Sequence, residues 1–202
     1  MTDTPAGPAP GHVPTLNIAN VLTTLRIIMV PFFVWALVAD DQQHAALRWV
    51  AVGLFVVAMY TDKLDGDLAR SRGLITNFGK IADPIADKLL LGAALVTLSW
   101  LGELWWWITI VILVRELGIT LLRFAVLRRG VIAASRGGKL KTVPQTAGLF
   151  LLLLPFTPAI TWLSIVALIV ILLAALITVY TGIDYIIQAA RMAPAGQGTE
   201  TP

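Results

Sequence analysis

Long apolar runs alternate with short polar connectors along most of this chain. The runs are rich in Leu, Ile, Val, Ala and aromatic residues, and they lack the two-residue alternation of a barrel strand. Because backbone exposed to lipid must satisfy its own hydrogen bonds, such runs predict helices. The six predicted spans cover residues 20–38, 45–60, 81–100, 104–127, 143–154 and 162–187.

Composition strengthens this prediction and extends it to an integral membrane protein. Charged residues make up 13% of the chain and the mean hydropathy is +0.82, whereas soluble domains usually carry about 25% charged residues. Several runs approach the roughly 20 residues that cross a bilayer. We therefore expect an all-α bundle of six transmembrane helices over residues 14–190. The Pro- and Gly-rich segments 1–13 and 191–202 are expected to be disordered tails.

The positive charges predict an orientation in the membrane. The connectors at residues 40–44, 102–103 and 155–159 contain no Lys or Arg, whereas the other two, at residues 61–80 and 128–141, carry four and five. Lys and Arg concentrate in cytoplasmic loops. We expect a plasma-membrane protein with both termini in the cytoplasm.

Five of the nine aspartates lie close together in the sequence: Asp62, Asp65, Asp67, Asp83 and Asp87. Asp62 and Asp65 follow the second span three residues apart, and Asp83 and Asp87 open the third span four residues apart. These spacings place each pair near one helical face, and two antiparallel helices joined by a loop can bring all four carboxylates together. Asp67 is expected to be a solvent-facing loop residue.

Four carboxylates in one pocket would suppress one another's ionisation unless a cation neutralised them. The chain has no Cys and two His, so any metal must be held by oxygen, which favours a hard cation such as Mg²⁺ or Mn²⁺. A pair of such ions is a common device in phosphoryl transfer. We predict a two-metal site at the cytoplasmic end of the second and third spans.

Small residues and one arginine complete this segment. Gly66, Ala69 and Gly79 would let a ligand approach the backbone closely, and Arg70 could pair with a carboxylate or a phosphate. The full pattern, D-x-x-D-G-x-x-A-R, eight residues, then G-x-x-x-D-x-x-x-D, resembles the signature of the CDP-alcohol phosphotransferases at every position. A lone D-x-x-D would more often be structural.

The resemblance covers about residues 17–188 and implies membrane enzymes with six transmembrane helices. It implies that Asp62, Asp65 and Asp83 ligate the metals and that Asp87, which also lies at the metals, is the general base. It also implies that Gly66, Ala69 and Gly79 line a cytidine nucleotide pocket.

The first span adds to the resemblance. Its segment NIANVLTTLRIIMVPFF is similar to the N-x-x-T-x-x-R-x-x-x-x-P start of the phosphatidylglycerophosphate synthases of that family. Arg26 would reach a phosphate or, alternatively, extend to the membrane surface. The expected contacts of CDP-diacylglycerol are Asn20, Thr23, Arg26, Asp65, Gly66, Ala69, Arg70 and Gly79.

Basic residues further along the chain indicate an anionic acceptor. RELGITLLR contains Arg115 and Arg123 eight residues apart, and GKLKTVPQ contains Lys139 and Lys141. Charges inside an apolar helix usually face a partner or a polar cavity. Both segments are similar to those that hold the phosphate of sn-glycerol 3-phosphate in phosphatidylglycerophosphate synthases. The supporting residues are expected to be Glu116, Thr142 and Gln145.

Three alternatives remain open at this stage. The first is a structural ion pair between Arg115 and Glu116, with the two lysines binding anionic lipid heads. The second is the same chemistry with another acceptor, as in cardiolipin synthases or phosphatidylinositol phosphate synthases. The third is a divalent-cation carrier, which the nearly featureless sixth span disfavours. The expected partners are membrane lipids and a second copy in a homodimer, and no nucleic acid.

Overall fold

Helices make up nearly all of the part of the chain that the structure describes. It is a computed structural model that describes residues 17–40, 45–71, 77–127 and 142–192. A helix stands at each of the six predicted positions, and no strand occurs in these ranges. The helices are α1 (Ile18–Val38), α2 (Ala46–Ser71), α3 (Asn77–Trp100), α4 (Trp106–Leu127), α6 (Thr142–Leu153) and α7 (Thr161–Met192).

The acidic segment is more helical than the sequence indicated. α2 continues beyond its predicted end at Tyr60 to Ser71, and α3 begins before its predicted start, at Asn77. The prediction that Asp67 is a loop residue is therefore wrong, since Asp67 lies within α2. The segment after Tyr60 contains no proline, and a single glycine in a helix costs only about 1 kcal/mol.

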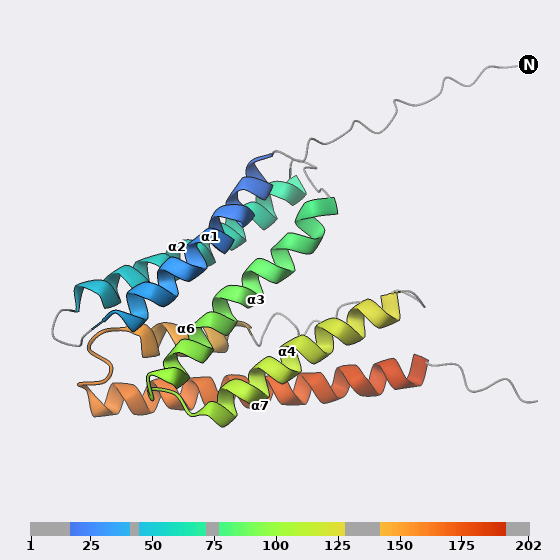
Figure 1. Ribbon diagram of the computed structural model, residues 1–202. Coiled ribbons are helices and arrows are strands. Elements are labelled where there is room, and N and C mark those ends of the chain that lie inside the picture. Colours follow the sequence, from blue (N-terminus) through green and yellow to red (C-terminus); the bar gives the residue numbers. More distant parts are fainter. Residues whose placement is uncertain (1–16, 41–44, 72–76, 128–141, 193–202) are drawn as a thin grey trace, which may run out of the picture.

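Two groups of helices pack together to form the bundle (Figure 1). α1 packs against both α2 and α3, whereas α4 and α6 pack against α7. A continuous apolar core joins the groups and includes Phe33, Phe55 and Leu95. Gly148 of α6 lies so close to α7 that a Cβ atom there would be 3.0 Å from the backbone nitrogen of Ile171.

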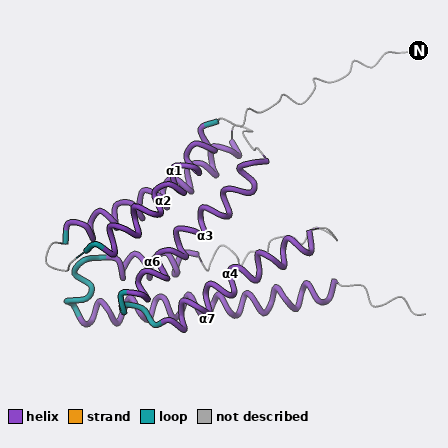
Figure 2. Tube along the Cα trace, viewed as in Figure 1, coloured by secondary structure: helices purple, strands orange, loops and turns teal. Residues whose placement is uncertain are grey.

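The helix ends have a clear polarity. The start of α1, the end of α2, the start of α3 and the ends of α4 and α7 point to one end of the bundle (Figure 1), and the α3–α4 and α6–α7 loops lie at the other (Figure 2). All seven tryptophans of the chain are exposed and lie at or near helix ends on this second side. They are Trp35, Trp49, Trp100, Trp105, Trp106, Trp107 and Trp162.

Two of the described helices are long and apolar enough to cross a membrane by length and composition, over Asn20–Val38 and Thr161–Ile187. α2, α3 and α4 instead carry charged residues. α6 has 12 residues, which corresponds to about 18 Å, less than the roughly 30 Å of a bilayer core.

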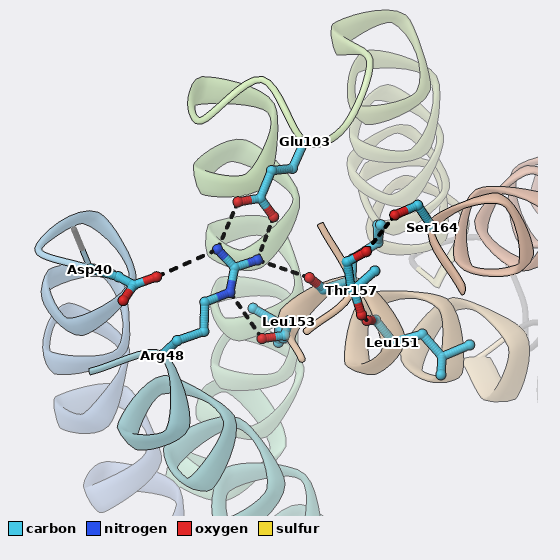
Figure 3. Close-up of polar contacts among 8 residues, drawn as sticks. Asp40, Arg48, Glu103, Leu151, Leu153, Thr157 and Ser164 are labelled. Atoms are coloured by element: carbon cyan, nitrogen blue, oxygen red, sulfur yellow. Dashed lines mark hydrogen bonds and ion pairs between the residues drawn. The ribbon is translucent and has the colours of Figure 1, made fainter. Parts of the chain in front are cut away.

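Arg48 joins several elements at the tryptophan-bearing end (Figure 3). Its side chain is 3% exposed, and its guanidinium pairs with both carboxylate oxygens of Glu103 in the α3–α4 loop. Nε donates to the Leu153 carbonyl at 3.1 Å and Nη2 to the Leu152 carbonyl at 2.9 Å. Asp40, after α1, lies 3.9 Å from Nη1. Arg48 therefore satisfies carbonyls at the end of α6, where intrahelical donors run out.

Replacement of Arg48 by methionine should destabilise the protein strongly. Removing one partner of a buried charge pair leaves the other uncompensated, which costs about 3–5 kcal/mol of unfolding free energy. Denaturation of the purified protein in detergent measures this loss. Lys63→Met is the matched control, because it removes one charge from an exposed position of the same helix. Equal stability of the two variants would contradict the assigned role of Arg48.

Candidate active site

A row of polar residues on α1 faces the interior of the bundle. Asn20, Thr23 and Arg26 are 5%, 0% and 1% exposed. Their spacing places them on the side of α1 that packs against α2 and α3. The side chain of Asn17 accepts a hydrogen bond from the backbone N–H of Asn20 at 3.0 Å and caps the start of the helix. Binding of a nucleotide by this row stays a prediction.

The arginine of this row is paired with the first aspartate of the signature. Arg26 Nη1 lies 2.6 Å from Asp62 Oδ1 on α2. A guanidinium stays charged in a protein, so its burial requires a nearby acceptor. The alternative that Arg26 extends to the membrane surface does not fit its burial. Asp62 is 37% exposed and is thus accessible from outside while it holds Arg26.

Asp87 on α3 lies within electrostatic range of charged residues from three other helices. These are Arg26 on α1, Asp62 on α2 and Glu116 on α4. Lys88, its neighbour in the chain, also acts on it. Asp87 itself is half-buried. The tertiary structure therefore places Arg26, Asp62 and Glu116 within electrostatic range of Asp87, between the middle of the bundle and the end opposite the tryptophans.

The other signature residues lie on the same two helices. Asp65, Gly66, Ala69 and Arg70 follow Asp62 along α2. Gly79 and Asp83 precede Asp87 along α3. The structure describes the backbone of these six positions but not their side chains, so it leaves the predicted convergence of four carboxylates as a prediction.

The predicted acceptor residues are only partly within the described chain. Arg115 and Glu116 form an ion pair on α4, with Nη1 and Oε1 2.8 Å apart, as the structural alternative expected. Arg123 also lies on α4, but the structure describes only its backbone and not its side chain. Lys139 and Lys141 lie outside the described residues. Of the supporting residues on α6, Thr142 is the first residue, and Gln145 is 3% exposed.

Sequence reasoning missed three residues that matter to this arrangement. Arg48 lies inside a predicted span, where an isolated charge signals a buried partner, so this signal was present. Thr181 and Gly182 on α7 contact Arg115. A Thr-Gly pair in an apolar helix carries no specific signal, because both residues are common at helix contacts in membranes.

The donor chemistry of the site fits a hard divalent cation. The chain offers no thiolate, and Asp62 and Asp87 supply carboxylate oxygens from two helices. These two carboxylates act unfavourably on each other, and a cation between them would relieve that repulsion. Among the side chains that the structure describes, no group of three acidic or histidine residues could hold a metal ion. Asp65 and Asp83 are not among those side chains.

Comparison with known proteins identifies the same family as the sequence motifs, over nearly the whole chain. A model of the CDP-alcohol phosphatidyltransferase family matches residues 16–188. The probable phosphatidylglycerophosphate synthase of Mycobacterium tuberculosis is 50% identical over 185 residues, which cover 92% of this chain and 87% of that protein.

More distant relatives carry the name of the same kind of enzyme. The CDP-diacylglycerol–glycerol-3-phosphate 3-phosphatidyltransferase of Bacillus subtilis is 35% identical over 74% of this chain and 88% of its own length. The enzyme of the same name from Shigella flexneri is 35% identical over 87% of this chain and 95% of its own length. This chain, whose described residues are almost entirely helical and pair Arg26 with Asp62 inside the bundle, belongs to the membrane-bound CDP-alcohol phosphatidyltransferase family.

Proposed function

We propose that this protein transfers the phosphatidyl group of CDP-diacylglycerol to sn-glycerol 3-phosphate, giving phosphatidylglycerophosphate and CMP. The observation that carries the proposal is the buried pair of Arg26 with Asp62, together with Asp87, which lies within electrostatic range of both residues inside an apolar bundle. The names of the relatives describe this reaction for those proteins. The arrangement suits the substrates, because one is a lipid and the other is soluble, so they must meet at a membrane surface.

The residues that would hold two Mg²⁺ or Mn²⁺ ions are Asp62, Asp65, Asp83 and Asp87. When bound, such ions would neutralise the charge of the diphosphate and of the departing CMP. Arg26 would then keep Asp62 in place from the α1 side. The row of Asn20, Thr23 and Arg26, with the small residues of α2 and α3, would bind the nucleotide end of the lipid.

Asp87 would act as the general base. It would take the proton of the 1-hydroxyl group of glycerol 3-phosphate. The hydroxyl oxygen would form its bond to the lipid-side phosphorus while the bond from that phosphorus to the CMP oxygen breaks. Half-burial of Asp87 limits access of water, which would otherwise compete as the acceptor.

A groove beside the site supports a lipid substrate. It has a volume of about 460 Å³ and begins at Met59, one helical turn before Asp62. Its lining is apolar except for one threonine, as the acyl chains of CDP-diacylglycerol require. The lining residues, from α2 and α6, are Phe55, Val56, Met59, Val143, Thr146, Ala147 and Phe150.

The exposed tryptophans support an orientation in the membrane. Tryptophan concentrates at the boundary between lipid and water, and all seven lie at or near the helix ends on the side opposite the end of α2 that carries Asp62. With the distribution of Lys and Arg, this supports a location of both termini and the active site on the cytoplasmic side of the plasma membrane. The proposal of six spans rests on the resemblance to the family. We also propose a homodimer, on the resemblance alone.

The acceptor is tested by the release of CMP. Purified protein with CDP-diacylglycerol and Mg²⁺ should release CMP with glycerol 3-phosphate and not with phosphatidylglycerol, inositol or inositol phosphate. Lys139→Gln should raise the KM for glycerol 3-phosphate about tenfold, as expected for a lost bond between charged groups. Preference for another acceptor would refute the proposal, and Mg²⁺ flux into vesicles without CMP release would favour a cation carrier.

Asp87→Asn should lower turnover by about 10²-fold or more, because the amide cannot accept the proton. Asp67→Asn is the matched control, since Asp67 lies on α2 outside the predicted metal set, and it should keep normal turnover. Steady-state CMP release at equal protein levels gives both values. Near-normal turnover of Asp87→Asn would rule out Asp87 as the base.

The orientation can be mapped with single cysteines, because the natural chain contains none. Ala159→Cys, between α6 and α7, should react with a membrane-impermeant maleimide in intact cells. Thr199→Cys, in the C-terminal segment, should react only after the cells are permeabilised. The opposite labelling pattern would invert the proposed topology.

A further inference from the structure

Arg115 makes a specific contact with the last helix of the bundle. Its Nη2 donates a hydrogen bond of 2.7 Å to Thr181 Oγ1 on α7. The hydroxyl of Thr181 in turn donates to a backbone carbonyl of its own helix, either Ile177 at 2.8 Å or Thr178 at 3.1 Å. That donation orients a lone pair of Oγ1 toward Arg115, so Thr181 acts as an acceptor of fixed direction.

The next residue of α7 leaves room for the arginine. A Cβ atom at Gly182 would lie 3.1 Å from both Cγ and Nε of Arg115, which is tighter than ordinary van der Waals contact. Gly182 is buried, and it lets the stem of Arg115 lie directly on the α7 backbone. By contrast, a Cβ atom at Gly118 on α4 would meet nothing within 4 Å. The absence of a side chain at position 182 therefore makes room for Arg115.

This contact leads toward the candidate base. Arg115 is 11% exposed and bonds Glu116 at 2.8 Å, and Glu116 acts electrostatically on Asp87. Polar contacts thus run from Thr181 on α7 through Arg115 to Glu116, which lies within electrostatic range of Asp87. α7 contributes to the site through Arg115.

We infer that Thr181 and Gly182 are positioning residues that hold the Arg115 guanidinium in the orientation that binds the phosphate group of the acceptor. The inference rests on the proposed function, in which the acceptor is a small phosphorylated alcohol. A guanidinium recognises a phosphate through parallel N–H donors in one plane. Loss of the contacts that hold the guanidinium in its plane should therefore weaken binding of the acceptor more than binding of CDP-diacylglycerol.

Paired variants test this inference. Thr181→Val removes the acceptor from Arg115 and should raise the KM for glycerol 3-phosphate about tenfold, with the KM for CDP-diacylglycerol changed less than about twofold. Thr181→Ser, which keeps the hydroxyl, should restore most of the affinity. The matched control is Thr178→Val on the same helix, since Thr178 is fully buried and its hydroxyl has no hydrogen-bond partner among the described residues.

Glycine variants test whether the space at Gly182 is needed to position Arg115. Gly182→Ala should raise the KM for glycerol 3-phosphate because the added methyl group displaces Arg115, whereas Gly118→Ala should leave it unchanged. Binding of glycerol 3-phosphate without CDP-diacylglycerol, measured by its effect on the melting temperature, should follow the same order in all variants. This second measurement does not depend on turnover.

The outcomes separate the two proposals. No release of CMP by the wild type with glycerol 3-phosphate would refute the proposed function, while the binding comparison would still decide the role of Thr181. Equal affinities in Thr181→Val and Thr178→Val would overturn the inference. So would an equal rise of both KM values in Thr181→Val, because that result indicates a general structural role.

Discussion

The guanidinium of Arg48 connects parts of the chain that lie far apart in the sequence. It binds Glu103 in the α3–α4 loop and two carbonyls at the end of α6, and it lies near Asp40 after α1. α6 is short and ends inside the bundle, where its last carbonyls have no intrahelical donor. Arg48 supplies donors, and Glu103 compensates the charge of Arg48. The ion pair of Arg48 with Glu103 thus adds a polar connection to the apolar packing that holds α6 in place.

Buried arginines also need nearby acceptors on the opposite side of the bundle. Arg26 is buried against Asp62, and Arg115 is held by Glu116 and Thr181. Each arginine joins helices through acceptors that its charge requires. On this side, however, Asp87 on α3 lies within electrostatic range of Asp62 on α2 and Glu116 on α4. A divalent cation bound there would relieve the repulsion that Asp87 experiences from these carboxylates.

The two ends therefore have different uses in a membrane. One carries exposed tryptophans and the ion pair of Arg48 with Glu103, and the other carries the residues to which we assign the proposed chemistry. A groove between α2 and α6 leads from the apolar side of the bundle to the neighbourhood of Asp62. A lipid held there would bring its diphosphate to the carboxylates without leaving the bilayer.

The sequence by itself determined the helices, the family and the residue types of the site. Apolar runs form helices through hydrogen bonds between near neighbours, so α1, α4, α6 and α7 lie within a few residues of their predicted ranges. The aspartate spacing was enough to recognise the family, because helical geometry converts spacing into shared faces. Boundaries failed where polar residues continued a helix, as at Asp67.

Only the tertiary structure decided which charges pair. Arg26 and Asp62 are 36 residues apart, Arg115 and Thr181 are 66 apart, and Arg48 and Leu153 are 105 apart. No local pattern encodes such pairs, since the partner of a buried charge depends on which helices pack together. The roles of Thr181 and Gly182 belong to this class, because a hydroxyl and a missing Cβ gain meaning only from the arginine packed against them.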